Sequence, residues 1–90
     1  DHLRTFTVPY SCCDLNRHMN NSRYFDITED LLTGPVSGRQ YSRIDAEYNT
    51  EVSCAQILNL TWKEDDKEAV VSGDKQRNCF RIRYTYKQPA

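Results

Sequence analysis

Hydrophobic and polar residues alternate along most of this chain, and the alternation predicts β-strands. Residues 3–10 form the first predicted strand, in which Phe6, Val8 and Tyr10 share one face. Pro9 cannot donate a hydrogen bond within a sheet, so we expect this strand to end there or to lie at an edge. The pattern therefore predicts a sheet that begins near the N-terminus.

A helical spacing interrupts the alternation between residues 22 and 33. The apolar positions of this segment can line one side of a helix: Tyr24, Ile27, Leu31 and Leu32. Asn20 or Asn21 is suited to cap the start of the helix, and the Gly-Pro pair at 34–35 is expected to end it. We expect the apolar side, Leu31 included, to be buried beneath the sheet.

Alternation returns after the helix and predicts further strands over residues 39–48, 54–62 and 68–72, with a charged hairpin tip at 63–67. The last strand is the clearest, because its two faces are fully segregated: Phe80, Ile82, Tyr84 and Tyr86 against Arg81, Arg83, Thr85 and Lys87. One helix can cover five strands only if the sheet curls around it. The order predicts an α+β hotdog fold, a curled antiparallel β-sheet wrapped around one central α-helix.

Composition narrows the possible functions. Ninety residues give room for a single domain, residues 1–90. Twelve basic and thirteen acidic residues leave a net charge of −1, and no basic stripe predicts a nucleic-acid partner. No apolar run approaches the ~20 residues that span a bilayer, and no signal-peptide pattern is present. We expect a soluble, cytoplasmic protein that binds neither nucleic acid nor a membrane.

The four cysteines are Cys12, Cys13, Cys54 and Cys79, and no pair has the C-x-x-C spacing of a zinc or redox site. We therefore expect reduced thiols, with Cys54 in the core. No metal and no cofactor is expected.

The segment between the first strand and the helix, residues 14–24 (DLNRHMNNSRY), combines a carboxylate, an amide and an imidazole within five positions. Unpaired N–H groups at the helix start can stabilise an oxyanion, while a carboxylate or imidazole can accept a proton from water. These parts suffice to hydrolyse an acyl bond. Taken singly, each residue also has a structural explanation: Asp14 and Asn16 as turn residues, His18 as a hydrogen-bonded histidine, Asn20 and Asn21 as caps, and Tyr24 as core.

The string D-x-N-x-H-x-N-N-x-x-Y over residues 14–24 resembles the signature of acyl-acyl-carrier-protein thioesterases, which release fatty acids from their carrier protein. The segment from Glu47 to Glu51 is similar to the family's E-Y-x-x-E segment on the strand after the helix. The likeness covers most of the chain and matches the C-terminal of two tandem hotdog domains. It implies that the chain is the C-terminal half of such a tandem, or one half of a homodimer.

The resemblance also implies roles for single residues: Asp14, Asn16, His18 and Glu51 as the catalytic group, and Asn20, Asn21 and Tyr24 as substrate contacts. Asp14 and Glu51 would orient the group and help to activate water. Asn16 and His18 would position the water and the thioester carbonyl, and a covalent route through a carboxylate stays open. Val52 stands where plant members often place a cysteine, so a cysteine nucleophile is excluded at that position. Arg17 replaces the glycine that is common in related motifs.

The activity implied by the resemblance is hydrolysis of fatty acyl-acyl-carrier protein, with the acyl chain on a phosphopantetheine arm and a free fatty acid as product. A second reading is an acyl-coenzyme A thioesterase, and a third is a non-catalytic hotdog module for acyl binding or oligomerisation. The Asn16-His18 pair and Glu51 favour the carrier-protein family.

Overall fold

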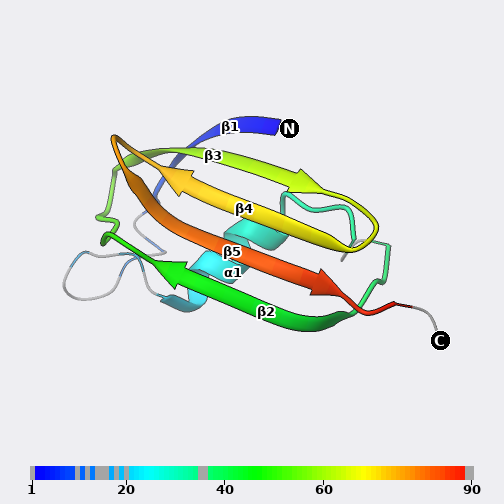
Figure 1. The fold of residues 1–90 in the computed structure, drawn as a ribbon. Helices are drawn as coiled ribbons and strands as arrows, with labels where there is room; N and C mark the ends of the chain where they lie inside the picture. The colour runs from blue at the N-terminus through cyan, green and yellow to red at the C-terminus, as the bar shows by residue number, and fades with distance from the viewer. Residues whose placement is uncertain are drawn as a thin grey trace.

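The computed structural model describes most of the 90-residue chain: residues 2–9, 11, 13, 17, 19, 21–34 and 37–88. The described residues form one helix and five strands in the predicted order (Figure 1). The bounds of the elements are β1 (His2–Thr7), α1 (Asn21–Glu29), β2 (Tyr41–Tyr48), β3 (Ile57–Glu64), β4 (Glu68–Asp74) and β5 (Asn78–Tyr86).

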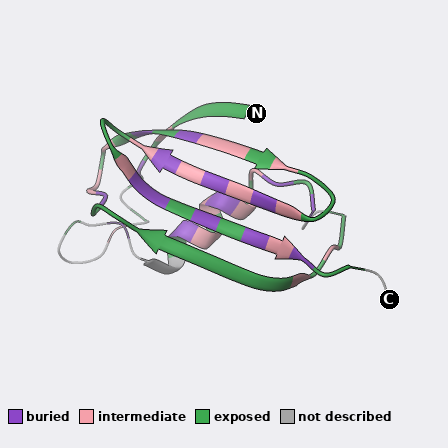
Figure 2. Cartoon of the chain, in the orientation of Figure 1, coloured by how far each residue is buried: buried purple, intermediate pink, exposed green. Residues whose placement is uncertain are grey.

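The strands form one antiparallel sheet in the order β1-β3-β4-β5-β2, and α1 lies against one of its faces (Figure 1). This arrangement confirms the predicted hotdog architecture, although the sheet stays open rather than closing around the helix. β1 lies at one edge and ends two residues before Pro9, as the missing N–H of proline predicts. β2 forms the other edge, and both edge strands are exposed along most of their length (Figure 2).

The core lies between α1 and the inner face of the sheet. The predicted apolar face of β5 is confirmed, because all of its members are at most 1% exposed: Phe80, Ile82, Tyr84 and Tyr86. Leu58 and Leu60 of β3 and Val71 of β4 complete this buried layer (Figure 2). Gly73 of β4 lies under the Phe80 ring, and a Cβ atom there would overlap the ring. The register of β4 against β5 shifts between Gly73 and Asp74.

The helix is shorter than its hydrophobic spacing predicts. It ends at Glu29, and the N–H groups of Leu31 and Leu32 donate three residues back, to Thr28 O at 3.2 Å and Glu29 O at 3.0 Å. This tighter turn rotates the chain, so that Leu32 is 2% exposed while Leu31 is only half-buried. The prediction that Leu31 is fully buried is therefore wrong. Thr28 is fully buried instead, and its hydroxyl donates to Tyr24 O at 2.8 Å.

Two strand starts differ from the prediction. β2 begins at Tyr41, with a register shift between Tyr41 and Arg43, and β3 begins at Ile57. Cys54 consequently lies in a turn and not on a strand. The described helix is neither long nor apolar enough to cross a membrane.

Glu64, predicted as part of a charged hairpin tip, lies at the end of β3 and accepts hydrogen bonds from its own chain. Its carboxylate accepts hydrogen bonds from Thr33 N at 3.0 Å, Thr33 Oγ1 at 2.7 Å, Gly34 N at 2.9 Å and the Tyr86 hydroxyl. Although partial burial acts to raise the pKa of Glu64, these four donors lower it to about 2. The carboxylate therefore anchors the chain after α1 to the end of β3.

Candidate active site

Hydrogen bonds of the backbone hold the first motif against the segment that follows Glu51. Met19 N donates to Val52 O at 2.7 Å, and Cys54 N donates to Arg17 O at 2.9 Å. Met19 and Val52 are also buried, at 5% and 0% exposure. Arg17 has a φ of 62°, the left-handed conformation that glycine adopts most easily. These contacts place Arg17 and Met19 of the first motif segment beside the residues that directly follow the second.

A disulfide strengthens the same junction. The Cys13 and Cys54 sulfur atoms are 2.08 Å apart, with Cα atoms separated by 6.1 Å and 41 residues of sequence. The expectation of reduced thiols is wrong for this pair, and Cys54 is half-buried rather than core. Cys79 is a free thiol, as predicted, and is buried. No spacing rule links Cys13 to Cys54, because only the folded loop brings them together.

Several predicted site residues lie outside the described residues: Asp14, Asn16, His18 and Asn20. Asn21 begins α1, but its side chain is also outside the described part. The remaining two are Tyr24, which is buried in α1, and Glu51, which is exposed three residues after the end of β2. Of the predicted site residues, the structure therefore places the side chains of Tyr24 and Glu51 only.

Tyr24 connects the helix to both strands at this end. Its ring packs edge-on against Phe80 at 4.7 Å and against Tyr48 at 5.2 Å between centroids. Burial, followed by the nearby Cys79, Tyr48 and Glu51, raises the pKa of Tyr24 to about 12. The phenol is consequently neutral near pH 7 and can donate a hydrogen bond but cannot act as a base. Because Glu51 contributes to the shift, its carboxylate lies within electrostatic range of Tyr24.

The β4–β5 turn also reaches this end, although no pattern in the sequence predicts it. Asn49 N and Thr50 N donate to Cys79 O at 2.8 and 3.1 Å, so the chain just before Glu51 is fixed to the start of β5. A hollow of about 380 Å³ lies beside this junction, and its lining is Thr50, Lys75, Gln76, Arg77 and Cys79. Tyr48 and Cys79 were missed as site neighbours, because pairing of β2 with β5 is a long-range contact.

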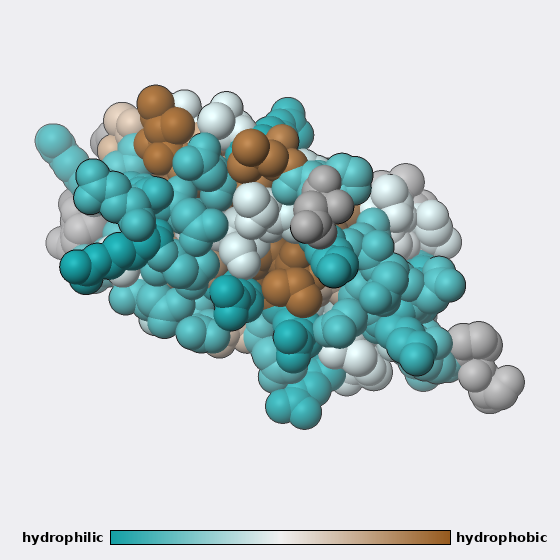
Figure 3. Space-filling model, turned by 45° about the horizontal axis from the view of Figure 1, so that its top comes forward, coloured by the Kyte–Doolittle hydropathy of each residue, from teal (hydrophilic) through white to brown (hydrophobic). Residues whose placement is uncertain are grey.

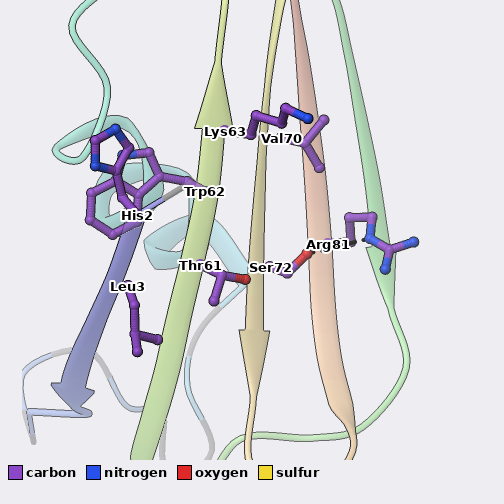
Figure 4. A pocket seen from close by; sticks show the side chains of 8 residues that line it. All are labelled: His2, Leu3, Thr61, Trp62, Lys63, Val70, Ser72 and Arg81. Carbon is purple, nitrogen blue, oxygen red and sulfur yellow. Dashed lines mark hydrogen bonds between the residues drawn. The ribbon is translucent and has the colours of Figure 1, made fainter.

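A second hollow, of about 560 Å³, lies on the sheet away from the motifs, mainly over β1, β3 and β4 (Figure 4). Its lining includes Lys63 and Arg81 but no carboxylate. The space-filling surface on this side is mainly hydrophilic, with a few separate hydrophobic patches (Figure 3).

Among the described residues, no group of three histidine, cysteine or acidic side chains can hold a metal. The junction of the two motifs is therefore the better candidate for catalysis.

Comparison with protein families agrees with the motif resemblance. Residues 1–87 match the model of the acyl-ACP thioesterase C-terminal domain, so the match includes both motif segments. The chain belongs to this family. A search of curated proteins found no match.

Solved structures show the same fold. An acyl-ACP thioesterase from Bacteroides thetaiotaomicron superposes with a TM-score of 0.82 at 24% identity, covering 93% of this chain and 36% of that one. A Staphylococcus aureus protein in complex with CoA gives 0.80 at 16% identity, covering 96% and 74%. A Lactobacillus plantarum protein described as an oleoyl thioesterase gives 0.74 at 21% identity, covering 98% and 38%. The chain thus spans little more than a third of the two acyl thioesterases, and hotdog is its fold.

Proposed function

We propose that this acyl-ACP thioesterase domain hydrolyses the thioester of fatty acyl-acyl-carrier protein and releases a free fatty acid. The observation that supports this most is the backbone junction between the motifs, with Met19 N 2.7 Å from Val52 O. Arg17 and Met19, which are next to Asn16 and His18 in the sequence, are thereby held beside the residues that follow Glu51. Family membership over residues 1–87 supports the same reaction.

In the proposed reaction, water attacks the thioester carbonyl, the C–S bond breaks, and the phosphopantetheine thiol leaves with a proton as the acyl group becomes the free fatty acid. Asp14 and Glu51 orient the group and activate the water, while Asn16 and His18 position the water and the carbonyl oxygen. The unpaired N–H groups at the N-terminus of α1 stabilise the negative charge that develops on the carbonyl oxygen. The substrate contacts proposed with them are Asn20, Asn21 and Tyr24, and Tyr24 remains a donor because its pKa is raised to about 12. The reaction needs no cofactor and no metal.

We further propose that residues 1–90 are a single hotdog domain whose β2 edge is completed by a second hotdog domain or a second copy of the chain. Ile44 and Tyr48 of β2 lie on the helix side of the sheet, opposite the buried Tyr84 and Phe80, yet they are 44% and 45% exposed. Exposed apolar side chains on an edge strand are suited to contact a partner.

Analytical ultracentrifugation of the Ile44→Lys variant tests this proposal by measuring association. The variant should lose the partner, while the control Leu3→Lys on β1 should keep it.

The catalytic assignment is tested by hydrolysis of acyl-acyl-carrier protein with the longest native form of the protein. Asp14→Asn and Glu51→Gln should each lower kcat by about 100-fold or more, since general acid–base groups contribute on that order. Glu47→Gln is the matched control, because Glu47 lies in the same E-Y-x-x-E segment but faces Arg81 across the outer side of the sheet. Equal rates in all four proteins would refute the assignment.

An acyl-coenzyme A thioesterase is the second candidate, because the Staphylococcus aureus neighbour was solved with CoA. The same assay with acyl-CoA separates the two: the carrier-protein reading requires a higher kcat/KM for the carrier-bound acyl group. If neither substrate is hydrolysed with the partner present, the domain is a non-catalytic acyl-binding or oligomerisation module.

A further inference from the structure

The hollow that Thr50 lines is adjacent to the segment that carries Glu51, a member of the proposed catalytic group. Thr50 precedes Glu51, and its N–H donates to Cys79 O at 3.1 Å, so the wall of the hollow and the catalytic segment share one fixed piece of backbone. The opposite wall is the β4–β5 turn, Lys75 to Arg77, whose shape is set by Lys75 N donating to Arg77 O at 3.1 Å. A group held in this hollow is therefore held at a defined place relative to the site.

The lining of the hollow is suited to an anion. The residues that line it carry one ammonium, one guanidinium, one amide, one hydroxyl and one thiol group, and none of them is a carboxylate. Lys75 and Arg77 are both exposed, and neither belongs to a salt bridge within the described part of the chain. The nearest acid in sequence, Asp74, accepts a hydrogen bond from Asn78 Nδ2 at 2.8 Å. At about 380 Å³ the hollow falls within the usual size of small-ligand sites.

Three other cations of the described chain are already engaged. Arg83 pairs with Glu68 at 3.0 Å, Arg43 pairs with Asp45 at 2.9 Å, and Arg39 lies 4.3 Å above the Tyr86 ring. Lys75 and Arg77 differ from these residues because they border a hollow, lie beside the candidate site and keep their charges available. An arginine fork with a nearby lysine is a common receptor for phosphate oxygens.

We propose that Lys75 and Arg77 bind the phosphate of the phosphopantetheine arm that carries the acyl group. The inference rests on the proposed thioesterase function and adds the residues that recognise the arm. Carrier protein and coenzyme A both present this phosphate, so the hollow recognises the chemistry common to the two substrates. Thr50 and Gln76 add neutral hydrogen-bonding groups beside the cations.

The experiment compares acyl-acyl-carrier protein, acyl-CoA and acyl-4′-phosphopantetheine with acyl-pantetheine, which lacks the phosphate. In the longest native form, Lys75→Gln combined with Arg77→Gln should lower kcat/KM about 10- to 100-fold for all three phosphate-bearing substrates, mainly through KM. The rate with acyl-pantetheine should stay unchanged, because this substrate has nothing for the cations to bind.

The matched control is Lys63→Gln combined with Arg81→Gln, which removes two cations from the hollow in Figure 4. This control should leave all four rates unchanged. An equal loss with acyl-pantetheine, or a loss only with the carrier protein, would overturn the phosphate assignment, as would a larger effect of the control pair. If wild-type protein hydrolyses none of the four substrates, it is the proposed function that fails.

Discussion

Polar groups at the two ends of the sheet have opposite environments. At the hairpin end, defined by Glu64, Thr33, Gly34 and Tyr86, one carboxylate receives four hydrogen bonds from its own chain and has a pKa of about 2. At the site end, defined by Tyr24, Tyr48, Thr50, Glu51 and Cys79, a neutral phenol, an exposed carboxylate and a hollow with two cations lie close together.

This difference distinguishes polar groups that stabilise the fold from polar groups that are available to a ligand. A carboxylate whose acceptor capacity is filled by the protein stabilises the fold and has little capacity left for a substrate. Cations that border a hollow and form no described salt bridge keep their capacity for a ligand. Changes at the hairpin end should therefore alter stability, whereas changes at the site end should alter activity or the tie between the motifs.

The largest effect on stability is expected from Leu32→Ala, next to the hairpin end. Leu32 is 2% exposed, so the cavity and the lost burial should reduce the free energy of unfolding by about 2–5 kcal/mol. Urea denaturation gives the value. Leu31→Ala is the matched control, and its cost should be clearly smaller because Leu31 is only half-buried. A larger loss for Leu31→Ala would mean that the helix continues past Glu29 in solution.

A comparison of β5 with the helix shows why the fold could be predicted from the sequence while some of its details could not. Strict alternation in β5 leaves a single choice of buried face, so Phe80, Ile82 and Tyr84 were predicted correctly. In the helix, the spacing predicted that both Leu31 and Leu32 are buried, and only Leu32 is. The tighter turn after Thr28 decides between them, and that turn depends on contacts with the sheet.

At the site end, the disulfide gives the next largest expected effect. Replacing Cys13 and Cys54 by serine opens a link across 41 residues and should cost about 2–4 kcal/mol of unfolding free energy. The variant should also lose activity at temperatures where it is still folded, because the motif loop is then tied to Val52 by fewer contacts. Thiol titration of denatured wild-type protein checks the disulfide bond. The unreduced protein should have two fewer titratable thiols than the reduced protein.

The candidate site could be predicted only as far as its motifs. The order of Asp14, Asn16, His18 and Glu51 carries the family resemblance, which the match over residues 1–87 bears out. The approach of Cys79, Lys75 and Arg77 depends on strand pairing between β2 and β5 and on the following turn. Such long-range pairings leave no local pattern in the sequence, and the same is true of Cys13 with Cys54.

The smallest effect, and the sharpest test of the hairpin end, is the acid dependence of stability. The folded pKa of Glu64, about 2, lies below its ordinary value of 4.5, so the ionised carboxylate stabilises the folded state above pH 4.5 and loses this contribution as the pH falls towards 2. Glu64→Gln should cost about 1–3 kcal/mol of unfolding free energy at neutral pH, because a charged acceptor is lost.

The difference in unfolding free energy between wild type and Glu64→Gln should shrink as the pH falls from 4.5 towards 2. The control Asp66→Asn, at the exposed tip, should stay close to wild type throughout. A difference that is constant from pH 7 to pH 2 would show that Glu64 acts through its shape and not its charge, and the contrast between the two ends would no longer rest on this carboxylate.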